Sequence, residues 1–295
     1  MRYRILLLLA AGFGFLLPPA RGQAPPRPPT HGGAPSVSPD GSKIAFLSDR
    51  DGAIDLYVIS TDGTGETRLT HTPESKGHPE WSSDGKVIRF ADFANDTSRV
   101  YTIEPDGKNQ KLIGSIPGRA ATLSPDGTRV LYWTGTWAAV KMFVSGLDGS
   151  GKKQLTDGSS VAWNTRWAPD GKRIAFTGRD AQEVLHVYVM EADGSGRRQV
   201  THLAPSDGQA QVPAWSPDGR QLAVQTGDRR LPGHIWIVDL ATGAAQKLNP
   251  HETYLDEVPA WFPDSKRIAF QSNRSGTTEV WVMNADGSAP RQVTR

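Results

Sequence analysis

The sequence predicts an all-β protein, a six-bladed β-propeller built of four-stranded antiparallel blades. The first observation is a turn segment of the type Trp-Ser-Pro-Asp-Gly that occurs six times along the 295 residues. The second is its spacing, because the copies recur about every 45 residues, a period typical of propeller blades. The third is a tight Asp-Gly pair between apolar runs in nearly every unit, which is a strong hairpin signal. The aspartates of the six turns are Asp40, Asp84, Asp126, Asp170, Asp218 and Asp264.

The composition fits a globular, turn-rich protein, with 37% hydrophobic residues, 31 glycines and 22 prolines. The absence of cysteine excludes a disulfide framework, a thiolate metal site and a cysteine nucleophile. The formal net charge is +2, but all the charge in residues 1–22 is basic, so the rest of the chain is nearly neutral. This balance gives no electrostatic reason to expect a nucleic-acid partner or binding to an anionic membrane.

Residues 1–22 have the pattern of a secretory signal peptide. Arg2 and Arg4 precede an apolar stretch from Ile5 to Leu17, which is shorter than the roughly 20 residues that span a bilayer. The small residues around Gly22 suit cleavage, and residues 23–34 form a Pro/Gly-rich linker. We therefore expect a periplasmic or secreted protein with no membrane insertion after signal cleavage; the alternative is an uncleaved anchor.

Each of the six units contains the same series of elements. A short strand ends at the tryptophan position, and the turn leads into a second strand such as Lys43–Phe46. A third strand such as Leu56–Ile59, the Asp-Gly turn and a fourth, polar strand such as Thr67–Thr70 complete the unit. No strand is shared between the ends of the chain, so we expect the ring to close by packing blade against blade. The predicted blades are 35–75, 76–117, 118–160, 161–205, 206–252 and 253–295.

The tryptophans that end the first strands are predicted to pack between adjacent blades, because large rings dominate the energetics of burial. They are Trp81, Trp167, Trp215 and Trp261.

Six turns of the Ser-Pro-Asp-Gly type, each followed by a strand of the Lys/Arg-Ile-Ala-Phe type, resemble the TolB-type propeller, also called the WD40-like or PD40 repeat. The resemblance covers residues 35–295, and Asp49-Arg50 and Asn273-Arg274 match the loop of this family. It implies an envelope protein that binds another protein on its propeller. TolB itself carries an α/β domain ahead of the propeller, whereas only the linker precedes it here, so the chain looks like a free-standing propeller of the family.

Two kinds of hydrolase are disfavoured by the motifs. No Gly-x-Ser-x-Gly occurs, so we expect no α/β-hydrolase site, and the zinc-protease pattern fails because Leu255 stands where a second histidine would follow His251. One catalytic alternative remains open. A related propeller family cleaves oligogalacturonate with histidines and a divalent metal in its cavity, which here would use His78, His251 and nearby carboxylates.

The loops that lead into the innermost strands are the least repetitive parts of the units, and function on a rigid scaffold concentrates in such connections. We expect a protein or peptide ligand at the mouth of the axial channel, with no cofactor, no catalytic residue and a monomeric chain. Ordinary solvated loops and a purely structural scaffold are the simpler explanations. The candidate ligand-binding residues are His78, Arg119, Trp163, Asn164, Gln211, His251, Tyr254, Asp256 and Glu257.

Overall fold

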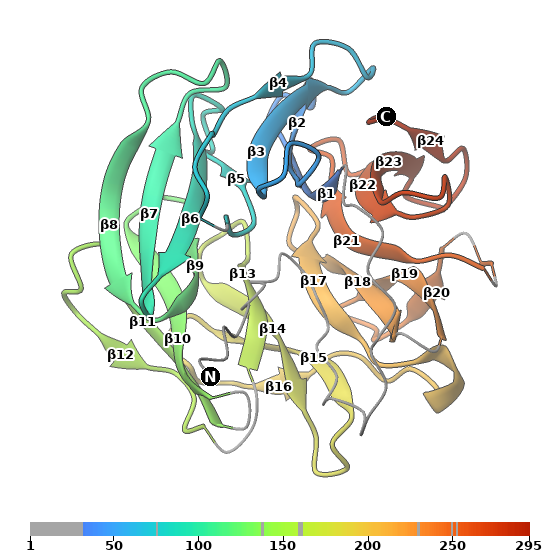
Figure 1. The fold of residues 1–295 in the computed structure, drawn as a ribbon. Coiled ribbons are helices and arrows are strands. Elements are labelled where there is room, and N and C mark those ends of the chain that lie inside the picture. The colour runs from blue at the N-terminus through green and yellow to red at the C-terminus, as the bar shows by residue number, and fades with distance from the viewer. Residues whose placement is uncertain are drawn as a thin grey trace, which may run out of the picture.

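The computed structural model describes residues 32–74, 76–136, 139–158, 162–228, 231–248, 250, 251 and 253–295. They form six four-stranded antiparallel sheets, each made of four consecutive strands (Figure 1). This confirms the predicted six-bladed propeller. The predicted signal peptide and all but the last three residues of the predicted linker lie outside the described residues.

Four strands at equivalent places build every blade, and they follow one another from the axis outward. The innermost strands are β1 (Gly33–Val37), β5 (Glu80–Trp81), β9 (Arg119–Leu123), β13 (Ala162–Trp167), β17 (Gln211–Trp215) and β21 (Asp256–Trp261). The second strands are β2 (Lys43–Ser48), β6 (Ile88–Ala94), β10 (Arg129–Thr136), β14 (Arg173–Arg179), β18 (Gln221–Asp228) and β22 (Arg267–Ser272).

The third strands are β3 (Asp55–Ser60), β7 (Thr97–Ile103), β11 (Ala139–Gly146), β15 (Leu185–Glu191), β19 (Leu231–Asp239) and β23 (Glu279–Asn284). The outermost strands are β4 (Thr67–Arg68), β8 (Lys111–Pro117), β12 (Lys153–Gln154), β16 (Arg198–Gln199), β20 (Ala245–Lys247) and β24 (Arg291–Gln292). A 3₁₀ turn, η1 (Pro205–Asp207), is the one helical element of the described residues, which contain no helix able to cross a membrane. Strand β1 begins two residues earlier than the first blade was expected to begin.

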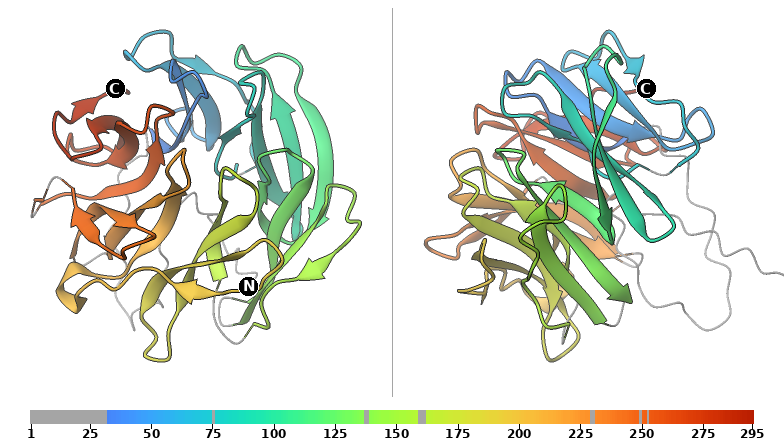
Figure 2. Two further views of the ribbon diagram at one scale, coloured as in Figure 1. Left: turned by 180° about the vertical axis from the view of Figure 1, so that it is seen from behind. Right: turned by 90° about the vertical axis from the view of Figure 1, so that its left-hand side faces the viewer.

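The alternation of strand directions gives the propeller two different faces. The loops that enter the innermost strands and the loops between second and third strands lie on one face, which we call the loop face. The Ser-Pro-Asp-Gly turns and the Asp-Gly hairpin turns lie on the other, the turn face. Figure 2 shows the blades from behind and from the side, with the first and last blades next to each other.

The Ser-Pro-Asp-Gly turn is held by its own side chains. The Asp40 carboxylate accepts hydrogen bonds from the Ser38 hydroxyl at 2.5 Å and from the Ser42 amide at 3.0 Å, and Ser38 Oγ accepts from the Lys43 amide at 2.9 Å. The Ser38 bond and the Ser42 bonds lower the pKa of Asp40 to about 2. Gly41 adopts a φ of 70°, a left-handed conformation that explains the glycine.

The apolar core lies between blades rather than inside any one of them. Trp215 packs with Ala175 and Val187 of the preceding blade, and its Nε1 donates to the Arg166 carbonyl at 3.1 Å. Trp81 packs in the same way and donates to the Ser36 carbonyl at 3.0 Å. The prediction that these tryptophans lie between adjacent blades is therefore confirmed for both.

A hydrogen bond from one blade to the next recurs along half of the ring, and we call it the latch. The innermost strand bulges at a residue with positive φ: Ala34 (50°), Val212 (48°) or Val258 (49°). The amide of that residue donates to a side-chain oxygen on the second strand of the preceding blade. The pairs are Val212 with Thr177 at 3.2 Å, Val258 with Gln225 at 2.8 Å, and Ala34 with Gln271 at 3.1 Å.

The third latch closes the ring, because Gln271 belongs to the last blade and Ala34 to the first. An apolar cluster joins the same two blades and includes Phe46, Tyr57 and Phe262. The expectation that the ring closes without a shared strand is confirmed by the strand order.

Replacing Gln271 with leucine tests this closure. The substitution leaves the buried amide of Ala34 without an acceptor, and we expect it to lower the unfolding free energy by about 1–3 kcal/mol. Urea denaturation measures the change, with Gln182→Leu on an exposed turn as the control. A Gln271→Leu protein as stable as the wild type would show that the latch does not hold the ring closed.

Replacing Ser124 with alanine tests the turn chemistry. The Ser124 hydroxyl is the largest cause of the lowering of the Asp126 pKa to about 2, so its loss raises this pKa toward 3.8. A carboxyl whose folded pKa lies below its unfolded value stabilises the fold above about pH 4, and the effect is lost as the pH falls toward 2. Carboxyl NMR titration should show the rise at Asp126 and no change at Asp170, where Ala168 already replaces the serine. A pKa of Asp126 that stays near 2 contradicts the assignment.

Candidate ligand-binding site

Four of the predicted site residues occupy one equivalent position, which we call the rim position. It is the innermost-strand residue that pairs with Leu47, Trp133, Thr177, Gln225 or Gln271 on the second strand. Five blades place a different residue there, near the loop face. These residues are Gly33, Arg119, Trp163, Gln211 and Glu257.

The side chains at the rim position differ in their exposure and in the contacts they already make within the protein. Arg119 is partly exposed, lies 4.4 Å from the centre of the Phe93 ring and pairs with Asp96 at 3.2 Å. Trp163 is buried against Leu185. Gln211 is also buried, and its side-chain carbonyl accepts no hydrogen bond from the described residues.

Glu257 is engaged in the latch. Its carboxylate accepts a hydrogen bond at 3.0 Å from the amide nitrogen of Gln271, whose oxygen receives the Ala34 amide. Because Gln271 joins the last blade to the first, a ligand contact by Glu257 would also affect ring closure.

Asn164, next to Trp163, takes the left-handed conformation with a φ of 51° and is partly exposed.

His251, Tyr254 and Asp256 meet in a cluster at the last blade. The buried Asp256 carboxylate accepts two hydrogen bonds from Arg274, at 2.6 and 2.8 Å, and lies 3.2 Å from His251 Nε2. Tyr254 stacks on His251 with ring centroids 3.5 Å apart, and His234 lies on the imidazole with centroids 4.6 Å apart. These contacts engage the Asp256 side chain within the protein, so Asp256 contributes to the fold here.

Two charged residues near the axis were missed by the sequence analysis, Glu80 and Arg166. They stand one residue before the tryptophan of β5 and β13, a place we call the axial position. The other four blades hold a small residue there, and this contrast is the signal that could have revealed them. The small residues are Ser36, Thr122, Ala214 and Ala260.

Glu80 lies on the innermost strand β5, and His78 lies in the loop directly before that strand. A Glu80 carboxylate oxygen accepts the amide of Leu123 on the neighbouring innermost strand at 3.3 Å. His78 Nδ1 lies 2.9 Å from the Pro79 carbonyl, so Nδ1 carries the proton and Nε2 keeps a free lone pair. Both side chains are partly exposed, as is Arg166, so solvent reaches the axis beside them.

Dense protein surroundings shift the ionisation of all three groups. Desolvation raises the pKa of Glu80, and the Arg166 charge opposes that rise. Desolvation and the Arg166 charge together hold the pKa of His78 well below 6.5. Desolvation lowers the pKa of Arg166, with the Glu80 charge acting in the opposite direction. Because β5 and β13 belong to blades separated by a third, this mutual influence predicts that the groups face a common interior space.

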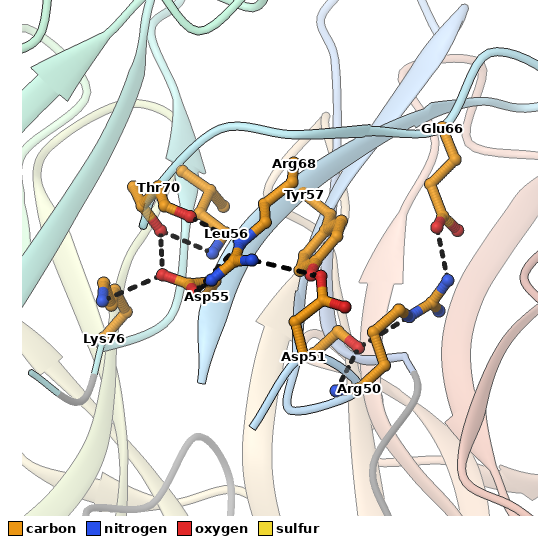
Figure 3. Close-up of polar contacts among 10 residues, drawn as sticks. Arg50, Asp51, Asp55, Leu56, Tyr57, Glu66, Arg68, Thr70 and Lys76 are labelled. Atoms are coloured by element: carbon orange, nitrogen blue, oxygen red, sulfur yellow. Dashed lines mark hydrogen bonds and ion pairs between the residues drawn. The ribbon is translucent and has the colours of Figure 1, made fainter. Parts of the chain in front are cut away.

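A further buried charged cluster belongs to the first blade and is drawn in Figure 3. The fully buried Asp55 accepts a hydrogen bond from Thr70 at 2.6 Å, pairs with Arg68 at 2.5 Å and lies 3.1 Å from the buried Lys76 ammonium. Burial opposes ionisation of Asp55, but these partners lower its pKa below 3.8. Arg68 also pairs with Asp51 at 3.3 Å, so two cations face two carboxylates, and the cluster fastens the loop that enters the second blade.

Metal binding has little support in this geometry. No three histidine, aspartate or glutamate side chains of the described residues come together closely enough to hold a metal ion. His234 and His251 are neighbours, but the carboxylate next to His251 is already held by Arg274.

Fold and site together define a six-bladed β-propeller that groups blade-specific polar side chains around its axis. The family profile described as the TolB beta propeller domain (PD40) matches residues 26–134, 78–207 and 141–295. The chain belongs to this family of TolB β-propellers.

Individual relatives are more distant. The chain is 39% identical over 88 residues to dipeptidyl-peptidase 5 of Porphyromonas endodontalis, which covers 28% of the chain and only 13% of that peptidase. TolB from Acinetobacter baumannii has a similar structure, with a TM-score of 0.70 at 22% identity over 85% of this chain and 63% of that one. Oligogalacturonate lyase of Vibrio parahaemolyticus follows with a TM-score of 0.60 at 14% identity, over 88% of this chain and 90% of the lyase. At these identities the two structures are informative about the fold alone.

Replacing Arg166 with methionine tests whether the three groups share one space. The Arg166 charge lowers the pKa of both His78 and Glu80, so its removal should raise both values. NMR titration of the imidazole and of the carboxyl group measures the two changes. If neither pKa rises, the groups do not face one another across the axis.

Proposed function

We propose that this chain is an exported, monomeric TolB-like propeller that binds a protein or peptide at the loop-face end of its axis. The observation that carries the proposal is the rim position, where blades with the same turns present different side chains. A repeated scaffold needs the turns and the core, but it does not need a different group in each blade at one end. Arg119 at the rim position and Asn164 beside the rim residue Trp163 are partly exposed, which leaves both side chains free to contact a ligand.

Export is proposed on the sequence of the first 22 residues, which have a basic start and a short apolar stretch. Membership in the TolB propeller family supports a place in the cell envelope.

The second candidate is a lyase that acts on an acidic polysaccharide. The contact of His234 with His251 favours it, because two imidazoles side by side can take part in binding a divalent metal. The matched ion pair of Asp256 with Arg274 weighs against it, since it removes the nearest carboxylate from that role. Calorimetric titration with Mn²⁺ and an absorbance assay on oligogalacturonate distinguish the two proposals. Binding of one Mn²⁺ together with cleavage would favour the lyase.

Selection of peptides from a random dodecapeptide phage library on the immobilised chain tests the binding proposal. We expect Arg119→Gln and Asn164→Gly to weaken the selected peptides about tenfold or more, because central interface residues carry most of the binding energy. Asn164→Gly preserves the left-handed backbone.

The matched control is Lys86→Ala, at an exposed turn of the turn face, which should leave the fluorescence-polarisation Kd unchanged. Peptides that lose affinity with Lys86→Ala but not with the rim variants would place binding on the wrong face and contradict the proposal. Failure to select any binder would also count against it.

A further inference from the structure

The axial position sets two charges deep within the ring. Glu80 and Arg166 pair with Arg89 and Ala175 of their second strands, the same register that holds a small residue in the other blades. Arg166 lies three residues beyond the rim residue Trp163, but the strand bulges between them, so their partners on β14 are only two residues apart, which corresponds to about 7 Å along a strand. A group that reaches Arg166 from the loop face must therefore pass the rim.

Arg166 uses little of its hydrogen-bonding capacity. Its Nη1 donates to the Thr165 carbonyl at 2.9 Å, and it forms no direct ion pair with a carboxylate of the described residues. A guanidinium offers five N–H donors in a planar fork that fits a carboxylate. Two arginines on second strands, by contrast, are engaged across blades: Arg129 donates to the Gly171 carbonyl at 2.9 Å, and Arg173 to the Gly219 carbonyl at 3.0 Å.

The Glu80 carboxylate also uses only part of its capacity to accept hydrogen bonds. One oxygen accepts the Leu123 amide, and Arg89, which donates to the Ser124 carbonyl at 3.2 Å, is a second cation whose charge acts on it. Both side chains keep some contact with solvent, but their protein surroundings disfavour the charged forms and the two groups form no direct ion pair, which costs stability; the other four blades hold small residues at this position. A ligand that touches both groups offsets that cost.

We propose that Arg166 binds the C-terminal carboxylate of a peptide that enters along the axis from the loop face. This inference rests on the proposed binding function and names the chemical group that the site selects. The last residue of a peptide carries a carboxylate and, close to it, a backbone N–H. Arg166 receives the carboxylate, and the free oxygen of Glu80 accepts the N–H. A chain terminus fits this place because the six innermost strands surround the axis, so an extended chain enters end-on.

Two matched random hexapeptide libraries test the proposal, one with free C-terminal carboxylates and one with C-terminal carboxamides. Each is passed over the immobilised chain, and the retained peptides are quantified by mass spectrometry. We expect the wild type to retain the free acids at least about tenfold better than the amides, because charge-assisted bonds to a carboxylate are roughly twice as strong as neutral ones.

The preference should disappear in Arg166→Met and be partly kept in Arg166→Lys, which preserves the charge. Arg129→Met is the matched control: it loses a contact between blades but no axial charge, and it should keep the preference. Circular dichroism and thermal melts verify that each variant is folded. If Arg166→Met does not fold, the free-acid preference of the wild type and its partial retention in Arg166→Lys still test the proposal.

The outcomes separate this inference from the proposed function. Equal retention of acids and amides by the wild type, with loss of both in Arg119→Gln, would overturn carboxylate selection and leave peptide binding at the rim intact. Retention of neither library would overturn both. A free-acid preference that survives in Arg166→Met would overturn the assignment to this residue.

Discussion

The ring depends on a hydrogen bond that crosses from one blade to the next near the axis, at three of its boundaries. An innermost strand bulges at a residue with positive φ, which turns its amide out of the sheet and toward the preceding blade. A glutamine or threonine oxygen receives it, and the pair Gln271–Ala34 uses this device to join residues 237 positions apart. A buried amide must find an acceptor, so each latch fixes the angle between two blades as well as their contact. Closure then needs no strand exchanged between the ends of the chain.

The remaining boundaries rely on other contacts. Leu47 and Trp133 stand where the latch residue would be, and neither provides a side-chain oxygen. Between the first and second blades, the Trp81 indole bonds to the Ser36 carbonyl, and the Lys76–Asp55 pair anchors the connecting loop. The ring is therefore held by a hydrogen bond that recurs at three boundaries and by contacts that differ from one boundary to another. A scaffold stabilised in this way can hold near its axis a charge such as Arg166, which forms no ion pair within the described part of the chain, since the stability it costs is supplied elsewhere.

Much of the fold could be predicted from the sequence because its signals are local. The serine, aspartate and glycine of each turn act on neighbouring atoms, and Ser38 and Asp40 bond within five residues. The candidate site was harder to predict. Glu257 and Asp256 were predicted from loop variability, yet their partners Gln271 and Arg274 become neighbours only through strand register and loop geometry. Whether the predicted residues bind a ligand stays a prediction. Glu80 and Arg166 lie within strands, so loop variability does not reveal them, although aligning the residue before each tryptophan separates them from the small residues of the other blades.

Amide hydrogen exchange at Ala34, Val212 and Val258 tests the central claim most directly. Amides that bond across a blade boundary in a closed ring should exchange as slowly as the central strands, through global unfolding only. The account predicts equal, strong protection at all three positions. Rapid exchange at Ala34 beside slow exchange at Val258 would show that the ring opens between its first and last blades, which would contradict closure by the latch.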